Sequence, residues 1–139
     1  MTATNQTTTA IGDFVQHHKI TLTSERTDAN PNMADSRDMD HHRCVLRCGG
    51  KRMTLIFSMG VGHRGSPPES TDVLSCLASD ASGVEDARSF EEWCSELGFD
   101  ADSRTAEKTY KVIIKQAIKL KRLLGDDAYR DLIGADYGN

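Results

Sequence analysis

Apolar residues alternate with polar ones in the first half of this chain and recur at helical spacing in the second half. Within residues 15–24, Ile20 and Leu22 alternate with polar neighbours, which predicts a strand. Residues 26–40 are rich in Asp, Asn, Pro and Ser and predict a long loop. Strands followed by helices indicate an α+β protein, in which a small antiparallel sheet of about three strands carries three to four helices on one face.

The Gly49-Gly50 pair predicts a tight hairpin turn, because glycine adopts the positive φ angles that such a turn requires. This turn places Leu46 opposite Met53 and Arg47 opposite Arg52. The outward face of the hairpin is therefore basic, and we expect Arg43, Arg47 and Arg52 on it. The opposite face is predicted to line the core with His42, Cys44, Leu46, Met53, Leu55 and Phe57.

Helical spacing begins after a Gly/Pro-rich connection at residues 60–68. Thr71 or Asp72 is suited to cap a short helix, whose apolar positions are Val73, Leu74, Leu77 and Ala78. Ser89 and Glu92 match the capping-box pattern and predict a second helix, which is expected to stop at Gly98. The buried side of that helix is predicted to consist of Phe90, Trp93, Cys94 and Leu97.

The longest helix is predicted to start at a cap on Asp102 or Ser103 and to end near Leu124. Its apolar stripe is Ala106, Tyr110, Ile113, Ala117, Leu120 and Leu124. A last short helix is predicted for about residues 127–133. We expect residues 1–14 to form a disordered tail and residues 15–139 a single domain, with a sheet part at 15–64 and a helical part at 69–134.

The net charge of −4 conceals blocks of opposite sign. Residues 65–102 hold 10 acidic side chains and 1 basic one, whereas residues 103–125 hold 7 basic and 1 acidic. A small protein polarised in this way is suited to binding through complementary electric fields. The pattern predicts contact surfaces, but by itself it does not identify the partner.

Three charged surfaces are candidates. The long helix carries one basic stripe, formed by Lys108, Lys111, Lys115, Lys119 and Arg122, which could contact phosphates or an acidic protein, or lie solvated beside the acidic segment. The arginines of the outward sheet face could bind an acidic partner or phosphate, or be paired within the chain by an acid such as Glu25. The third surface is acidic and could mimic a nucleic-acid backbone, or its carboxylates could be solvated and cap helices. Its members are Glu85, Asp86, Glu91, Glu92 and Glu96.

Catalytic and cofactor motifs lack the context that they need. Residues 60–65 match G-x-G-x-x-G, but Ser66-Pro67-Pro68 follows, where a dinucleotide site requires a helix. On a strand, Cys44 and Cys48 lie ~13 Å apart and cannot share a zinc ion. A site using His42, Cys44 and a distant Cys76 or Cys94 stays open as an alternative. We interpret Cys44, Cys76 and Cys94 as core residues and predict no enzymatic activity, no cofactor and no bound metal.

The N-terminus is rich in Thr and lacks the basic start and apolar segment of a secretory signal, and no run of residues is long and apolar enough to span a membrane. We therefore expect a cytoplasmic protein without a membrane partner, in which the four cysteines are reduced thiols.

Several short strings are shared with a known group of proteins. They include Phe57-Ser58-Met59-Gly60, Ser89-Phe90-Glu91-Glu92-Trp93-Cys94 and Gly98-Phe99-Asp100-Ala101-Asp102-Ser103-Arg104. Over roughly residues 20–130 the chain resembles small phage- and prophage-encoded proteins of mostly unassigned function. The resemblance implies a bacterial host cell, and small charged phage proteins include inhibitors of host machinery such as anti-CRISPR proteins.

These observations lead to a functional hypothesis. We expect a non-enzymatic, phage-encoded protein that binds a host complex, such as a CRISPR effector, and inhibits it through its charged surfaces. The alternative is a direct nucleic-acid-binding accessory protein of phage replication or regulation, which would use the basic helix at 103–125.

Overall fold

A computed structural model describes residues 6–28, 30–31, 39–60 and 66–137 of the chain. The three strands form one antiparallel sheet in the order β1-β2-β3, and helices pack on it, so the predicted α+β class is confirmed. Within the described ranges one helix precedes the sheet and four follow it. The elements are α1 (Gln6–His18), β1 (Thr21–Thr27), β2 (Met39–Cys48), β3 (Lys51–Gly60), α2 (Ser70–Asp86), α3 (Phe90–Leu97), α4 (Arg104–Leu124) and α5 (Asp126–Tyr137).

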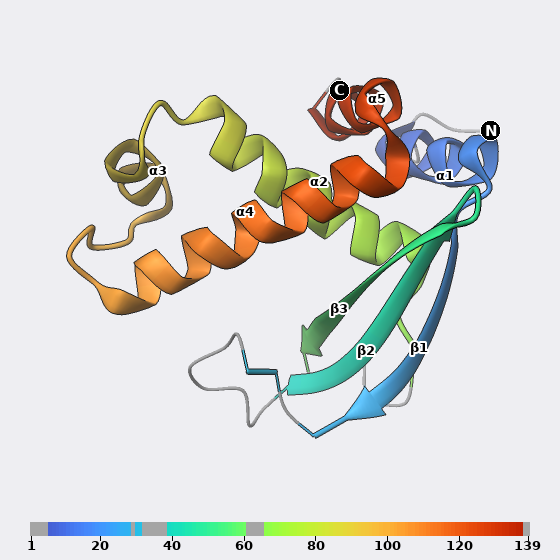
Figure 1. Ribbon diagram of the computed structural model, residues 1–139, viewed down its shortest axis with the longest axis horizontal. Coiled ribbons are helices and arrows are strands. Elements are labelled where there is room, and N and C mark those ends of the chain that lie inside the picture. The colour runs from blue at the N-terminus through green and yellow to red at the C-terminus, as the bar shows by residue number, and fades with distance from the viewer. Residues whose placement is uncertain (1–5, 29, 32–38, 61–65, 138–139) are drawn as a thin grey trace.

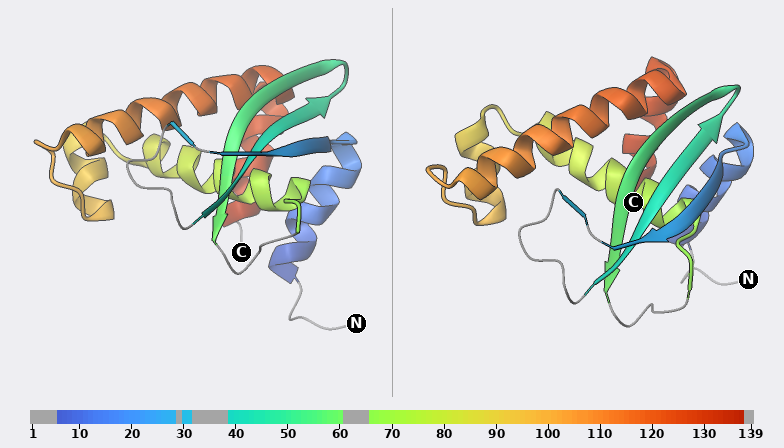
Figure 2. Two further views of the ribbon diagram at one scale, coloured as in Figure 1. Left: turned by 90° about the horizontal axis from the view of Figure 1, so that it is seen from below. Right: turned by 60° about the horizontal axis from the view of Figure 1, so that its bottom comes forward.

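The helices form a layer along one side of the curved sheet (Figures 1 and 2). Helices α2 and α4 pack against each other, and α4 also contacts β2 and β3. Helices α1 and α5 lie side by side near the end of α4 that meets the hairpin, whereas α3 lies at the opposite end of α4 (Figure 1). Helix α4 therefore connects two distant ends of the molecule.

Helix α1 differs from the sequence prediction. Residues 6–18 are helical, where a disordered tail to residue 14 and a strand from residue 15 were predicted, and that prediction is wrong for these residues. Ile11 and Phe14, three positions apart, are only 4% and 7% exposed and belong to the main core. Burial against the other helices overrides the weak helix propensity of the Thr-rich sequence.

The hairpin of β2 and β3 follows the predicted register. Gly49 and Gly50 form its turn with positive φ angles of 58° and 86°, and Leu46 pairs with Met53 while Arg47 pairs with Arg52. Cys44, Leu46 and Met53 are buried in the core, as the alternating pattern predicted. Strand β1 pairs with β2 from Thr21 to Thr27, so the first strand lies further along the chain than predicted.

The predicted loop at 26–40 is shortened by the strands on either side, since β1 continues to Thr27 and β2 begins at Met39. Residues 29 and 32–38 of that loop lie outside the described part of the chain. The same is true of residues 61–65, which make up most of the G-x-G-x-x-G string, whereas its first glycine, Gly60, ends β3.

The predicted helix ends are largely confirmed. The Ser89 hydroxyl accepts the backbone N–H of Glu92 at 3.1 Å and caps α3, and Gly98 ends that helix with a φ of 79°. Ser103 caps α4, which ends at Gly125 as predicted. The cap of α2 was predicted wrongly: Glu69 caps this helix, and Asp72 reaches back to the Glu69 backbone N–H.

The apolar side chains form two clusters. The main core joins the sheet to α1, α2, α5 and the last turns of α4, and a smaller cluster around Trp93 holds α3 against the start of α4. Leu123 is buried in the main core although the predicted stripe omitted it. Leu97 was predicted to be buried but is 57% exposed, because α3 ends there and no described element covers its side chain.

We expect Ser103→Ala to lower the free energy of unfolding by about 1 kcal/mol. The Ser103 hydroxyl accepts the backbone N–H groups of Thr105 and Ala106 at 3.1 and 3.3 Å, and alanine leaves both donors without this acceptor. Urea titration measures the loss. Ser95→Ala, which makes the same change at an exposed position inside α3, serves as the control and should not destabilise the protein.

Candidate functional site

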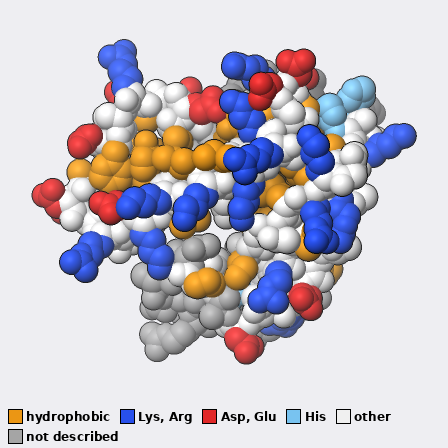
Figure 3. All heavy atoms as spheres, viewed as in Figure 1, with side chains coloured by type: hydrophobic (Ala, Val, Ile, Leu, Met, Phe, Trp, Pro, Cys, Tyr) orange, Lys and Arg blue, Asp and Glu red, His pale blue; other side chains and the backbone are white. Residues whose placement is uncertain are grey.

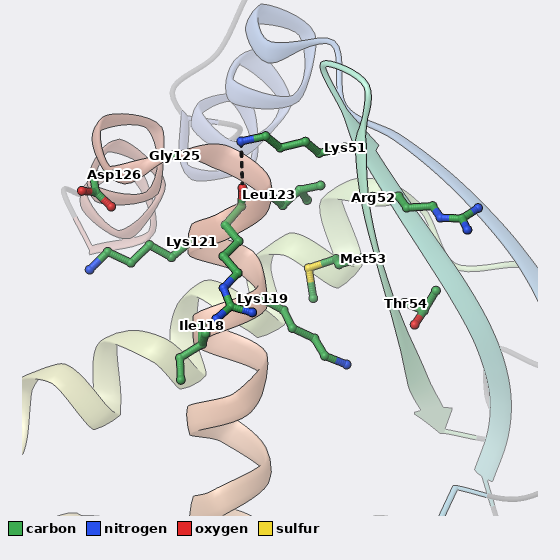
Figure 4. Close-up of a pocket in the computed structure, with 11 residues that line it drawn as sticks. Lys51, Arg52, Met53, Thr54, Ile118, Lys119, Lys121, Leu123, Gly125 and Asp126 are labelled. Carbon is green, nitrogen blue, oxygen red and sulfur yellow. Dashed lines mark hydrogen bonds between the residues drawn. The ribbon is translucent and has the colours of Figure 1, made fainter.

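A groove of about 1150 Å³ lies between the start of β3 and the last turns of α4. Its sides are basic and its floor includes apolar side chains (Figure 4). The hairpin contributes Lys51, Arg52, Met53 and Thr54, while the end of α4 and the following residues contribute Ile118, Lys119, Lys121, Arg122, Leu123, Gly125 and Asp126. Lys119 and Arg122 of the predicted basic stripe are among these residues.

Packing of α4 on the hairpin creates this groove. Met53 and Leu123 are buried at 5% and 4% exposure and point toward each other between strand and helix (Figure 4). Lys119 points into the space between α4 and β3, and Lys51 reaches across to the end of α4, where its Nζ donates to the Arg122 carbonyl oxygen at 3.3 Å (Figure 4). This bond ties the hairpin to the C-terminal end of α4.

The charge of the groove is strongly positive. Five of the described residues that line it are Lys or Arg and one, Asp126, is acidic. The Arg52 and Lys121 side chains point away from the space between α4 and the hairpin (Figure 4). Among the described residues, Lys119, Arg52 and Arg122 form no ion pair. The Lys121 Nζ lies 5.7 Å from the centroid of the Tyr129 ring, a distance that fits a cation–π contact. Cations held close together without acidic partners attract an anionic ligand or surface.

The predicted basic stripe of α4 is exposed along its whole length. Lys108 donates to the Pro31 carbonyl oxygen at 2.9 Å, and Lys111 pairs with Glu107 at 3.2 Å, so both also have partners within the chain. Lys119 and Arg122 line the groove. Figure 3 shows Lys and Arg side chains gathered beside a band of hydrophobic side chains on this face of the molecule.

Two of the three arginines on the outer sheet face contact neighbours on the same face. Arg43 lies 3.8 Å from the Glu25 carboxylate, and Arg47 donates to the Thr23 hydroxyl at 3.0 Å. Glu25 therefore pairs with Arg43 rather than separating Arg47 from Arg52, which lie directly opposite each other. Arg52 is among the residues that line the groove, but its side chain points away from α4 (Figure 4).

The acidic candidates lie at the end of α2 and on α3, and α3 lies at the end of α4 opposite to the groove (Figure 1). Glu85 accepts the Tyr129 hydroxyl at 2.8 Å, and the Glu92 carboxylate accepts the Arg88 backbone N–H at 2.7 Å. These two acids have structural roles. The other three are exposed and form no ion pair with a described residue: Asp86, Glu91 and Glu96.

The cysteines show no feature of an activated nucleophile. Burial raises the pKa of the Cys44 and Cys94 thiols, and the charges of Glu91 and Asp100 raise that of Cys94 further. Partial desolvation of the Cys76 thiol by neighbouring atoms, with a smaller contribution from Asp80, raises its pKa to about 11. All three stay protonated at neutral pH. Cys76 lies on the exposed side of α2, so its predicted place in the core is wrong.

Histidine was also a candidate metal ligand. His41 is only 3% exposed, and its Nδ1 lies 2.7 Å from the Ser58 hydroxyl. His42 faces the core as predicted. Within the described ranges, no three His, Cys, Asp or Glu side chains are arranged to hold a metal ion.

The comparisons with known proteins give no assignment. This chain matches no model of a protein family, no curated protein and no solved structure. Among the described helices, none combines the length and the apolar character that crossing a bilayer requires.

Sequence reasoning missed the groove as a site, although it identified Arg52, Lys119 and Arg122 as binding candidates. Met53 was placed only in the core. No local pattern links the hairpin to the end of α4, because the contact between Lys51 and Arg122 spans 71 residues of sequence.

Proposed function

We propose that this chain is a non-enzymatic, phage-encoded protein that binds a host nucleic-acid-handling complex, such as a CRISPR effector, and blocks it. The observation that supports binding is the groove, whose described lining includes five residues of Lys or Arg and one acidic residue. The phage setting and the inhibitory role rest on the resemblance of the sequence to small phage proteins. The groove is the surface that we expect to make the decisive contact.

The lining of the groove favours an acidic protein surface as the ligand. None of the described residues that line it is aromatic, whereas proteins that hold single-stranded nucleic acid combine cations with aromatic rings on which bases stack. Ile118, 47% exposed, and the apolar floor instead offer a place for an aliphatic side chain. An apolar centre surrounded by charge is typical of protein–protein contacts.

The exposed basic stripe of α4 supports a second candidate function. Lys111, Lys115 and Lys119 follow one another along the helix and could track a phosphate backbone. In that case the protein is an accessory nucleic-acid-binding protein of phage replication or regulation. Such binding would weaken steeply with salt, and replacing these three lysines with Glu would abolish it.

An affinity pull-down from the bacterial host, with and without nuclease, separates the two functions. We expect a host protein complex to be captured in both cases. Lys119→Glu/Arg122→Glu should lower capture at least about tenfold, equivalent to ~1.4 kcal/mol, because two groove cations become like charges facing an acidic partner.

The matched control is Arg43→Glu/Arg130→Glu, which makes the same change in net charge at two exposed arginines outside the groove. It should capture the complex as the unaltered protein does. Capture of nucleic acid alone, lost after nuclease treatment, would replace the inhibitor proposal with the nucleic-acid binder. Capture of neither would contradict both functions.

A further inference from the structure

The acidic end of the molecule carries an exposed apolar side chain. Leu97, at the last position of α3, is 57% exposed, more than Ile118, the other large hydrophobic residue described as exposed. Glu96 precedes it, and Asp100 and Asp102 follow it, all exposed. None of these carboxylates forms an ion pair with a described residue. This region, residues 96–102, is called the acidic tip below.

The groove has the opposite character. Its accessible apolar side chain is Ile118, 47% exposed, since Met53 and Leu123 are only 5% and 4% exposed. The cations Lys119 and Arg122 are exposed beside it. An exposed leucine among carboxylates therefore matches an exposed isoleucine beside a lysine and an arginine, both in charge and in the placing of the apolar centre. The molecule contains both halves of a complementary contact.

The two halves cannot meet within one chain. The acidic tip precedes the first turn of α4, and Lys119 lies near the last turn. Along α4, Ser103 and Lys119 are about 24 Å apart, at ~1.5 Å per residue. Helix α4 is continuous between them and holds α3 and the hairpin at opposite ends (Figure 1).

We propose that the acidic tip of one copy of this protein docks in the groove of a second copy. This head-to-tail contact places Leu97 against the exposed Ile118, with Glu96 and Asp100 near Lys119 and Arg122. A head-to-tail contact leaves a free tip and a free groove on every pair. Association therefore extends beyond two copies unless the rotation that relates neighbouring copies closes a ring.

Self-association would control access to the groove. The acidic tip is short, so the buried area falls below the ~1,200 Å² typical of stable complexes, and we expect a dissociation constant on the order of 0.1 mM. A tighter acidic partner would displace the second copy. The inference does not depend on the identity of that partner and can fail while the proposed function holds.

Sedimentation velocity of the purified chain over a concentration series tests the contact. At ~0.05 M salt we expect the average sedimentation coefficient to rise with protein concentration, and at ~0.5 M salt the rise should largely disappear because the charges are screened. A chain that stays monomeric at millimolar concentration and low salt would overturn the proposal. An association that is unchanged by salt would also overturn it.

Variants locate the contact. The groove variant Lys119→Glu/Arg122→Glu and the tip variant Glu96→Lys/Leu97→Ser should each be monomeric. Each keeps only one of the two surfaces that the contact between copies requires. All four side chains are exposed, so the fold should survive, which thermal unfolding checks. Arg43→Glu/Arg130→Glu should associate as the unaltered chain does.

Mixing the two variants gives the sharpest test. The groove variant retains its tip and the tip variant retains its groove, so an equimolar mixture should form one-to-one pairs that cannot extend further. Pairs in the mixture, with monomers in each separate sample, are the result expected. A mixture that stays monomeric, or a variant that still associates alone, would show that the tip and the groove do not bind each other.

Discussion

Leu46→Ala should lower the free energy of unfolding by about 3–5 kcal/mol, the largest effect that we expect from a single substitution in this protein. Leu46 lies on the central strand β2, is completely buried, and belongs to the main core that joins the sheet to the helices. Alanine removes its apolar contacts and leaves a cavity that the surrounding sheet cannot close. In urea the midpoint of unfolding should fall by roughly 2 M.

Leu97→Ala provides a matched control for this prediction. It makes the same chemical change at a side chain that is 57% exposed, and it should change the free energy of unfolding by less than ~0.5 kcal/mol. Equal losses at the two positions would contradict the assignment of Leu46 to the core and of Leu97 to the surface. The pair also separates stability from binding, since Leu97 lies in the proposed contact between copies.

The second large effect concerns pH. Burial raises the pKa of Tyr129 above its ordinary value of 10.0. The hydrogen bond to the Glu85 carboxylate and the negative charge of that carboxylate raise the pKa further. The folded state therefore holds the phenol proton more tightly than the unfolded state. This contribution to stability is complete below pH 10 and is lost as the pH rises, at ~1.4 kcal/mol per pH unit, until the folded-state pKa is reached.

We therefore expect the free energy of unfolding to fall by about 1 kcal/mol more between pH 9 and pH 11 in the unaltered protein than in Tyr129→Phe. Urea titrations at the two pH values measure this difference. Glu85→Gln should reduce the additional fall without removing it, because burial is the largest cause of the shift. A Tyr129→Phe protein that loses stability as steeply as the unaltered protein would show that another group causes the decline.

These two predictions concern the framework that holds the groove. Helix α4 contributes Leu120 and Leu123 to the main core, and Tyr129 of α5 packs in the same cluster while bonding to Glu85 of α2. The groove cations therefore project from elements that are fixed by buried contacts. A groove on rigid elements keeps its cations in place before a ligand arrives, which lowers the entropic cost of binding.

Features that depend on near neighbours could be predicted from the sequence. Gly49 and Gly50 determine the hairpin turn, and the turn determines which residues of β2 and β3 face each other. Ser89, Gly98 and Ser103 mark helix ends through contacts within one turn of the backbone. The basic stripe of α4 follows directly from helical spacing. All of these rest on interactions within a few residues.

Features that depend on remote packing were decided by the tertiary structure. Residues 6–18 become a helix because Ile11 and Phe14 are buried by other helices, against a weak local preference. Leu97 stays exposed because no described element covers the end of α3, although its spacing is that of a buried residue. The groove exists because α4 packs on the hairpin and brings Lys51 to Arg122 across 71 residues. Hydrophobic spacing shows which side chains can be buried, but the packing of distant elements decides which of them are.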